Sequence, residues 1–200
     1  DGEVLRAALA GGLLDLVATD HAVFNSTQKA VGRDDFRILP NGVNGLEERM
    51  PVLWGEMVST GEISRSRFVE VTSTAAAKIF NVYPKKGAIA AGSDADIAII
   101  DPEAENVISA KTHHSRMDTN VYEGRAYQGK VVTTLSRGRV MWDNGKFTQE
   151  ARAGTGKFVH MEPFAPMFYG AGSDRTTKKE QEIAELAARY AKKGDAKDEL

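Results

Sequence analysis

The chain has 200 residues, of which 42% are hydrophobic, so it is long enough to bury a core as one large or two small domains. Its formal net charge is -2 with acidic and basic residues interspersed, and no apolar run approaches the roughly 18 residues of a membrane helix, so we expect neither a nucleic-acid nor a membrane partner. The absence of cysteine excludes disulfides and thiolate metal sites but is compatible with either redox environment.

The N-terminal segment is predicted to be a helix followed by a strand. Apolar residues in 4–13 have the spacing of a short helix, which the glycine pair 11–12 is expected to end. Residues 14–18, which are apolar except for Asp15, predict a short buried strand, and a helix followed by a strand is the repeating unit of an α/β barrel. Because the chain begins at Asp1 in mid-pattern, without an initiator Met or a signal peptide, we expect it to be the C-terminal part of a longer protein.

The most informative residue is Asp20, which follows this strand and precedes His21. A carboxylate at the end of an apolar strand usually faces a cation, a metal or backbone donors. Active sites of α/β barrels lie at the C-terminal ends of the strands, which agrees with the place of Asp20. The alternative is that Asp20 only caps the next turn through its side-chain oxygen, and spacing alone leaves both interpretations open.

A long loop and then a helix are predicted next. Residues 21–45 are too polar, and too irregular in their hydrophobic period, to form one regular element, and long ordered loops in compact domains are usually functional. A helix is expected over 47–58, with Pro51 tolerated in its first turns and two glutamates near its positive N-terminus. Its apolar residues have helical spacing and are interpreted as core, namely Met50, Leu53, Trp54 and Met57.

Two shorter helices are predicted before a domain boundary. Ser64 can cap a helix that runs to Val71, and Thr72 or Ser73 can cap a second one that runs to Phe80. The turn cluster at 83–87 is interpreted as the boundary. We therefore predict three parts: a part with helices and one strand (1–82), a small β domain (83–156) and a C-terminal extension (157–200).

The β domain is predicted from short strand signals. These cover 95–100, 106–109, 130–136 and 139–142, and Asp143-Asn144-Gly145 predicts a hairpin turn into 146–148. The aspartates of the turn at 92–96 are interpreted as structural, because a turn that enters a strand uses Asp for local backbone hydrogen bonds. His113 and His114 are left out of the metal site, because metal-binding pairs usually have helical or strand spacing.

The C-terminal extension is predicted to be an extended tail followed by a helix. Residues 157–169 contain His160 and four aromatic side chains that need an apolar surface, such as a neighbouring subunit. Thr177 and Glu180 have capping-box spacing, and an amphipathic helix is expected to reach Tyr190. The last four residues, 197–200, match the retrieval signal of the endoplasmic reticulum, so this compartment is favoured over the cytoplasm. The alternative is a solvated charged tail.

Residues 18–54, ATDHAVFNSTQKAVGRDDFRILPNGVNGLEERMPVLW, resemble the eighth-strand region of dihydropyrimidinases, the metal-dependent cyclic amidohydrolases that include the hydantoinases. The resemblance continues through 68–102, FVEVTSTAAAKIFNVYPKKGAIAAGSDADIAIIDP, and through 108–114, ISAKTHH. The family has a similar THH stretch that does not bind its metals, so the resemblance implies that His113 and His114 lie in a loop that packs against the barrel. It implies an α/β fold: the C-terminal end of a TIM barrel, part of a small β-sandwich domain and a C-terminal helical tail. It also implies a homotetramer.

The resemblance also implies a site. In the family, the Asp after the eighth strand binds a metal ion and shuttles a proton, which corresponds to Asp20, and the Asn of the PNG loop, here Asn41, holds the substrate through its main-chain groups. The implied cofactors are two zinc ions, whose other ligands, histidines and a carboxylated lysine, come from earlier strands. The implied reaction is hydrolysis of dihydrouracil or dihydrothymine to N-carbamoyl-β-amino acids in pyrimidine catabolism. This chain alone is expected to be inactive.

Three alternatives are open. Collapsin response mediator proteins share much of this sequence but act as scaffolds without the metal site, and they lack an Asp at the position of Asp20, so its presence favours an enzyme. A hydantoinase or allantoinase with another cyclic substrate is the second alternative, although 25–36 and 41–50 resemble dihydropyrimidinases more. The third is a structural remnant in which Asp20 is only a turn cap.

Overall fold

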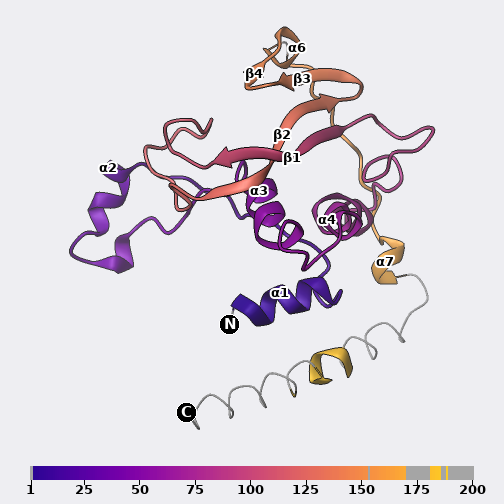
Figure 1. Ribbon diagram of the computed structural model, residues 1–200, viewed down its shortest axis with the longest axis horizontal. Helices are drawn as coiled ribbons and strands as arrows, with labels where there is room; N and C mark the ends of the chain where they lie inside the picture. Colours follow the sequence, from indigo (N-terminus) through magenta and orange to yellow (C-terminus); the bar gives the residue numbers. More distant parts are fainter. Residues whose placement is uncertain (1, 153, 170–180, 186–187, 189–200) are drawn as a thin grey trace. The chain divides into compact units, whose positions relative to one another are not determined.

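The computed structural model of the protein describes residues 2–152, 154–169, 181–185 and 188, which contain short helices and a four-stranded antiparallel sheet (Figure 1). The chain divides into two compact units, the first built from residues 1–16, 69–93 and 157–200 and the second from 17–68 and 94–156. Each unit therefore combines segments that are distant in sequence. The domain bounds predicted above stay a prediction. None of the described helices is long and apolar enough to cross a membrane.

The first helix is confirmed, and the strand after it is not. Helix α1 spans Gly2–Ala10, and Gly12 ends it with a φ of 83°, a conformation that favours glycine. Residues 14–18 are wrongly predicted as a strand, because they run without ladder hydrogen bonds. A strand needs a neighbouring strand to pair with, and the sheet of the described residues contains only β1 to β4, all after residue 96.

The helix predicted over 47–58 is present with a change of winding. Helix α3 spans Arg49–Leu53, and the π-helical turn η3 continues it over Trp54–Val58. Pro51 lies in the first turn, where its missing N–H is tolerated. Of the four predicted core residues, Leu53, Trp54 and Met57 are buried, whereas Met50 is only partly buried. Sequence periodicity of 3.6 residues did not predict the π-helical turn.

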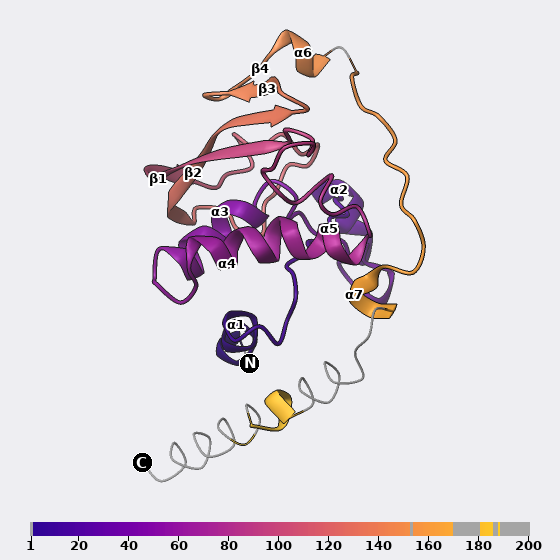
Figure 2. The same cartoon turned by 90° about the vertical axis from the view of Figure 1, so that its right-hand side faces the viewer.

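The next two predicted helices form one continuous helix (Figure 2). It consists of α4 (Arg65–Val69), the π-helical turn η4 (Glu70–Thr74) and α5 (Ala75–Ile79). The predicted cap at Ser64 is confirmed, since its hydroxyl accepts a hydrogen bond from Arg67 N. The predicted second cap at Thr72 or Ser73 is wrong, because both residues lie inside the helix. Hydroxyl side chains are compatible with a helix interior when they find other partners, and Thr74 Oγ1 donates to the carbonyl of Gly87 at 2.7 Å.

The core of the second unit forms where η3 packs on strand β2. Gly129, with a φ of 100°, lies against the indole of Trp54, and a Cβ at this position would lie only 2.1 Å from Trp54 Cδ1. Gly55 lies equally close to the ring of Tyr127. The Trp54 ring also meets Phe68 edge to face, with 5.1 Å between the centroids. Two glycines thus allow the helix and the sheet to approach closely.

The sheet has the order β1-β2-β3-β4, with β1 at Ile97–Val107, β2 at Ala126–Ser136, β3 at Arg139–Asp143 and β4 at Lys146–Phe147. The two strands predicted over 95–100 and 106–109 are a single strand whose register shifts between Asp101 and Glu105. The hairpin at 143–145 is confirmed, with positive φ at Asn144 and Gly145. This sheet is one layer, so the expected β-sandwich stays a prediction.

The turn before β1 and the C-terminal tail complete the described structure. Asp96 accepts a hydrogen bond from Arg137 N at 2.8 Å, which is a structural role. The tail from 154 is extended until α7, Pro166–Tyr169, and Phe158 within it is 88% exposed. The predicted capping residues Thr177 and Glu180, the helix end at Tyr190 and the signal at 197–200 lie outside the described residues. Residues 181–185, inside that predicted helix, are helical.

Candidate functional site

Asp20 lies exposed in a strained backbone conformation with a φ of 47°. A residue other than glycine is uncommon in this conformation, although Asp and Asn adopt it more readily than most, and such residues cluster at functional sites. Within the described part of the chain, its carboxylate makes no hydrogen bond or ion pair. Thr19 Oγ1, and not Asp20, accepts the hydrogen bond of the next backbone N–H, from His21 at 3.3 Å. The carboxylate is therefore available to a ligand, while its role stays a prediction.

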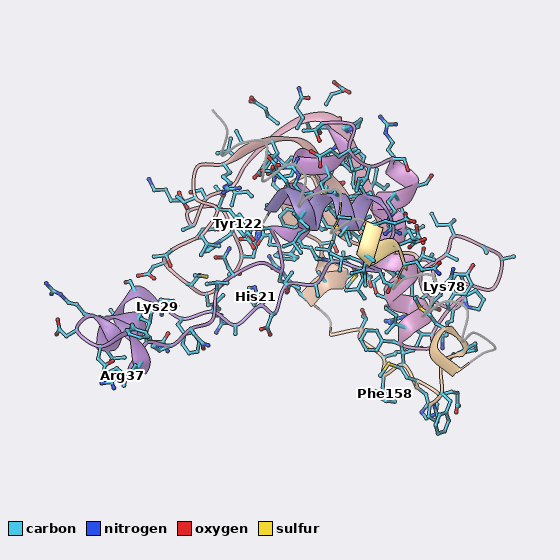
Figure 3. All side chains as sticks on the ribbon, turned by 90° about the horizontal axis from the view of Figure 1, so that it is seen from below. His21, Lys29, Arg37, Lys78, Tyr122 and Phe158 are labelled. Carbon is cyan, nitrogen blue, oxygen red and sulfur yellow. The ribbon has the colours of Figure 1, made fainter. Side chains whose placement is uncertain are left out.

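His21, the residue after Asp20, is anchored by hydrogen bonds to the turn that precedes helix α3. Its Nδ1 atom accepts hydrogen bonds from Gly45 N at 3.2 Å and from Leu46 N at 3.1 Å. Because Nδ1 accepts twice, the ring proton lies on Nε2. Figure 3 shows His21 on the long loop that also carries Lys29 and Arg37. In the sequence His21 is only the neighbour of Asp20, and no local pattern predicts this anchoring role.

Two further contacts hold the segment of Asp20 beside residues 42–49. Ala22 N donates to Val43 O at 3.1 Å, and Arg49 Nη1 donates to Val17 O at 3.1 Å. Partial burial of the Arg49 guanidinium lowers its pKa below the usual value, although it stays protonated at neutral pH. The backbone on both sides of Asp20 is thus tied to the same short segment.

Asn41 lies at the exposed turn that leads into this segment. Lys29 Nζ donates to the carbonyl oxygens of Pro40 at 2.7 Å and of Gly42 at 2.9 Å, so it clamps the residues on both sides of Asn41. Among the described residues, the N–H and C=O of Asn41 itself have no hydrogen-bond partner. Both main-chain groups are therefore available, as the predicted contact with substrate requires. No contact between Asn41 and the Asp20 carboxylate is present in this part of the chain.

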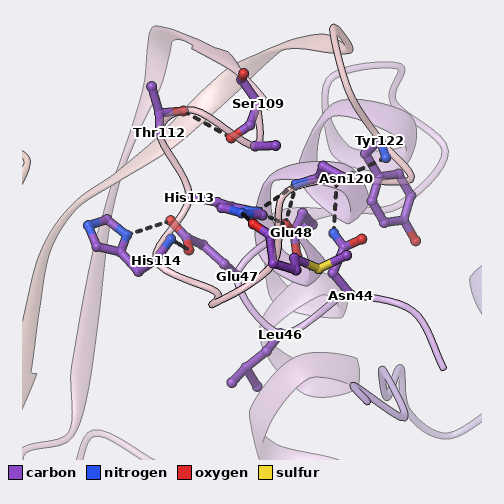
Figure 4. A network of polar contacts seen from close by, with 12 residues as sticks. Asn44, Leu46, Glu47, Glu48, Ser109, Thr112, His113, His114, Asn120 and Tyr122 are labelled. Carbon is purple, nitrogen blue, oxygen red and sulfur yellow. Dashed lines mark hydrogen bonds and ion pairs between the residues drawn. The ribbon is translucent and has the colours of Figure 1, made fainter. Parts of the chain in front are cut away.

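A second set of contacts at the start of α3 is a buried polar network (Figure 4). Asn44, Glu48 and Asn120 are 1%, 2% and 8% exposed. Asn44 Nδ2 donates to Asn120 Oδ1 at 2.8 Å, and Asn120 Nδ2 donates to Glu48 Oε1 at 2.7 Å. Glu48 Oε2 has no partner among the described residues. This network was not predicted, because single Asn and Glu residues in polar segments carry no distinctive local signal.

The two adjacent histidines join this region to the connection between β1 and β2. The His113 Nε2 atom lies 3.0 Å from Met117 O, so it must donate, and Nδ1 can then accept from Asn120 Nδ2 at 3.2 Å. His114 contacts Glu47 through its backbone N–H at 2.8 Å and through Nδ1 at 3.0 Å. The expected role of the pair in packing a loop is consistent with these contacts at residues 47 and 48.

The residues near Asp20 fit a metal site only in part. A free carboxylate is a suitable oxygen ligand for a divalent cation. However, the described residues contain no group of three or more His, Cys, Asp or Glu side chains that could hold an ion. Asp20 can therefore supply one ligand but not a complete site within this part of the chain.

Comparisons with known proteins place these residues in a family context. A model of the amidohydrolase family matches residues 3–141. Dihydropyrimidinase of Arabidopsis thaliana is 55% identical over 169 residues, which are 84% of this chain and 32% of the relative. The chain thus spans about a third of the length of this relative.

Solved structures show the same similarity. The crystal structure of dihydropyrimidinase from Brevibacillus agri NCHU1002 matches with a TM-score of 0.78 and 45% identity, over 82% of this chain and 35% of that chain. D-Hydantoinase (dihydropyrimidinase) from Thermus sp. matches with a TM-score of 0.78 and 41% identity, over the same shares of both chains. Over 82% of its length, this chain therefore shares the α/β fold of the matching part of these proteins.

Proposed function

The chain belongs to the amidohydrolase family, and from that premise we propose that the full-length protein is a cyclic amidohydrolase of the dihydropyrimidinase type. Its substrate is then 5,6-dihydrouracil or dihydrothymine, and water opens the ring at an amide bond to give an N-carbamoyl-β-amino acid. Similarity to Arabidopsis thaliana dihydropyrimidinase and to the Brevibacillus agri enzyme supports this substrate class. The single observation that carries the proposal is Asp20, exposed, strained and without a partner in the described chain.

Asp20 has two roles in this proposal. Its carboxylate holds one ion of a binuclear zinc centre, whose chemistry when bound is to polarise the ring carbonyl and to acidify water. As a general base, the carboxylate accepts the proton of the attacking water and then returns it to the ring nitrogen as the C–N bond breaks. The remaining ligands, including a carboxylated lysine, are not provided by the described residues.

Asn41 orients the ring. A cyclic diamide presents alternating C=O and N–H groups, which match the unpaired N–H and C=O of Asn41. The clamp from Lys29 to the carbonyls of Pro40 and Gly42 holds these groups in place before substrate binds. Because these donors and acceptors are already held in position, little entropy is lost in orienting them when the substrate binds.

A hydantoinase activity is the second candidate, because the structure from Thermus sp. is a D-hydantoinase (dihydropyrimidinase) at 41% identity. Hydantoin is also a cyclic diamide, so Asp20 and Asn41 would act on it in the same way. Comparing ring opening of dihydrouracil and hydantoin by one preparation separates the two candidates. A homotetrameric assembly and residence in the endoplasmic reticulum are further proposals, which light scattering and organelle fractionation test.

The decisive experiment replaces Asp20 in the full-length protein by Asn. Asn tolerates a positive φ, so Asp20→Asn removes the charge and the proton acceptor without a new backbone cost. We expect dihydrouracil hydrolysis to fall by about 10²- to 10⁴-fold and bound zinc to fall below the wild-type content. The matched control is Asp34→Asn, an exposed aspartate of the same loop, which should keep both. Full activity of Asp20→Asn, or a wild-type protein without metal and without ring opening, would contradict the proposal and favour a scaffold.

A further inference from the structure

The short turn 44–48 has two sides that contact different parts of the chain. On one side, the N–H groups of Gly45 and Leu46 bind His21, the neighbour of Asp20. On the other side, Asn44 and Glu48 bind Asn120, in the connection between β1 and β2. The turn therefore links the residue after Asp20 to the connection between β1 and β2.

The side that faces Asn120 has little freedom. Asn120 Oδ1 accepts from Asn44 Nδ2 at 2.8 Å and from Tyr122 N at 2.9 Å, so its Nδ2 group must face Glu48 and His113. Asn44 Oδ1 accepts from Val121 N at 3.1 Å. Because the polar atoms of both amides are engaged and both side chains are buried, neither amide can turn over without leaving a buried group unpaired.

The side that faces His21 depends on close approach. A Cβ at Gly45 would lie 3.1 Å from Thr19 Cβ, so the turn rests directly on the segment that leads to Asp20. Asp tolerates a positive φ better than most residues, and contacts on both sides of Asp20 help to hold it there. They include the hydrogen bond from His21 N to Thr19 Oγ1 and the double hydrogen bond to His21 Nδ1.

We propose that Asn120, through Asn44 and the backbone of residues 45 and 46, is a remote positioning residue for Asp20, with His21 as the intermediate. The inference rests on the proposed function, because the consequence of correct positioning is catalytic. It assigns a role in the active site to the connection between β1 and β2, which is distant in sequence from the loop of Asp20. Asn120 itself touches neither substrate nor metal in this proposal.

A double-mutant cycle on the full-length protein tests this chain of contacts. The variants are Asn120→Ala, His21→Ala and the double variant, with dihydrouracil hydrolysis as the assay. We expect each single substitution to lower kcat by up to about a hundredfold, with a smaller change in KM, since the substrate contact at Asn41 is retained. The double variant should lose no more than the worse single variant, because both act on the same hydrogen bonds. Multiplied losses in the double variant would overturn the proposal.

A rescue and a control exclude a general loss of folding. His21→Asn places an amide oxygen where Nδ1 lies, so it should recover most of the kcat that His21→Ala loses. Thr119→Ala changes an exposed neighbour of Asn120 and should behave as wild type. Equal losses in His21→Asn and His21→Ala would show that the acceptor does not matter, and this result would overturn the proposal.

A readout that does not depend on catalysis separates this inference from the proposed function. The amides of Gly45 and Leu46 are protected by His21, so hydrogen exchange of a peptide covering 40–48 should accelerate in Asn120→Ala under native conditions. If the wild-type protein opens dihydrouracil but exchange of this peptide is unchanged in Asn120→Ala, the positioning role alone is overturned. Accelerated exchange in a protein without ring-opening activity would support the mechanical link and contradict the proposed function.

Discussion

At the scale of single residues, Gly42 decides how closely the two loop segments beside Asp20 and Asn41 approach. A Cβ added at Gly42 would lie 2.0 Å from Ala22 O and 2.9 Å from Ala22 C, both backbone atoms that cannot turn aside. Gly42 O is also one of the two carbonyls that Lys29 clamps. The glycine is therefore required for space, and its loss would displace the turn that carries Asn41.

We predict that Gly42→Ala in the full-length protein weakens substrate binding more than it weakens the chemical step. The displaced turn should misplace the main chain of Asn41, raise KM for dihydrouracil about tenfold and lower the free energy of unfolding by about 1–3 kcal/mol. Steady-state kinetics and urea unfolding measure both effects. Gly156→Ala is the matched control, since a Cβ there meets nothing within 4 Å. An unchanged KM in Gly42→Ala would contradict this role.

At the scale of elements, the connection between β1 and β2 holds the long loop by a second contact besides Asn120. Asp118 accepts hydrogen bonds from the backbone N–H of Ser26 at 2.8 Å and from its hydroxyl. Ser26 begins helix α2, Ser26–Lys29, where a carboxylate is also favoured by the free N–H groups of the first turn. The loop of Asp20 is thus attached to the β domain at Ser26 and at Asn44.

We predict a dependence on pH from this contact. The hydrogen bonds from Ser26 lower the pKa of Asp118 below its usual 3.8, so the folded state binds the proton more weakly than the unfolded state. The stabilising contribution is therefore complete above about pH 5 and is lost as the pH falls through 3.8 toward the lowered pKa. The melting temperature of wild type should exceed that of Asp118→Asn at neutral pH, and the difference should shrink in acid.

Ser26→Ala tests the same contact from the donor side. It removes the hydroxyl that lowers the pKa of Asp118, so its melting temperature should lose part of the same pH-dependent increment. The double variant should resemble Asp118→Asn alone, because both substitutions remove one interaction. A difference between wild type and Asp118→Asn that is constant from neutral to acid pH would contradict the assignment.

At the scale of the whole molecule, the chain covers only a part of what its relatives contain. It spans 32% of Arabidopsis thaliana dihydropyrimidinase, and its described residues contain no complete set of metal ligands. In our proposal, Asp20 is one ligand of a centre whose other members are supplied elsewhere in the full-length protein. In this proposal, activity therefore requires the full-length protein.

We predict that the activity lost on removal of metal is restored by added zinc in wild type but not in Asp20→Asn. Dialysis of the full-length protein against a chelator should abolish ring opening and lower the melting temperature, because a metal that binds only the native state stabilises it. Zinc added back should restore wild-type activity, as followed by dihydrouracil absorbance and metal analysis. Activity that survives chelation with no bound metal would contradict the metal-dependent mechanism.

Sequence patterns predicted the elements whose cause is local. The cap at Ser64, Pro51 in the first turn of α3 and the hairpin at Asn144-Gly145 each depend on residues within one turn of one another, and all three are present. The strand at 14–18 was wrong because pairing needs a partner that local patterning cannot supply. The second cap at Thr72 or Ser73 was wrong because the helix continues through both residues, and a hydroxyl side chain by itself does not end a helix.

The sequence by itself determined the family, because the resemblance of residues 18–54 and of the segments after them agrees with the amidohydrolase match over 3–141 and with 55% identity to a dihydropyrimidinase. Only the tertiary structure decided how these residues are held. Asn120 lies 76 residues from Asn44 and 72 from Glu48, yet the three share one buried network. No local period records such a contact, because it depends on where the chain returns after the β1 strand, and burial then makes its hydrogen bonds obligatory.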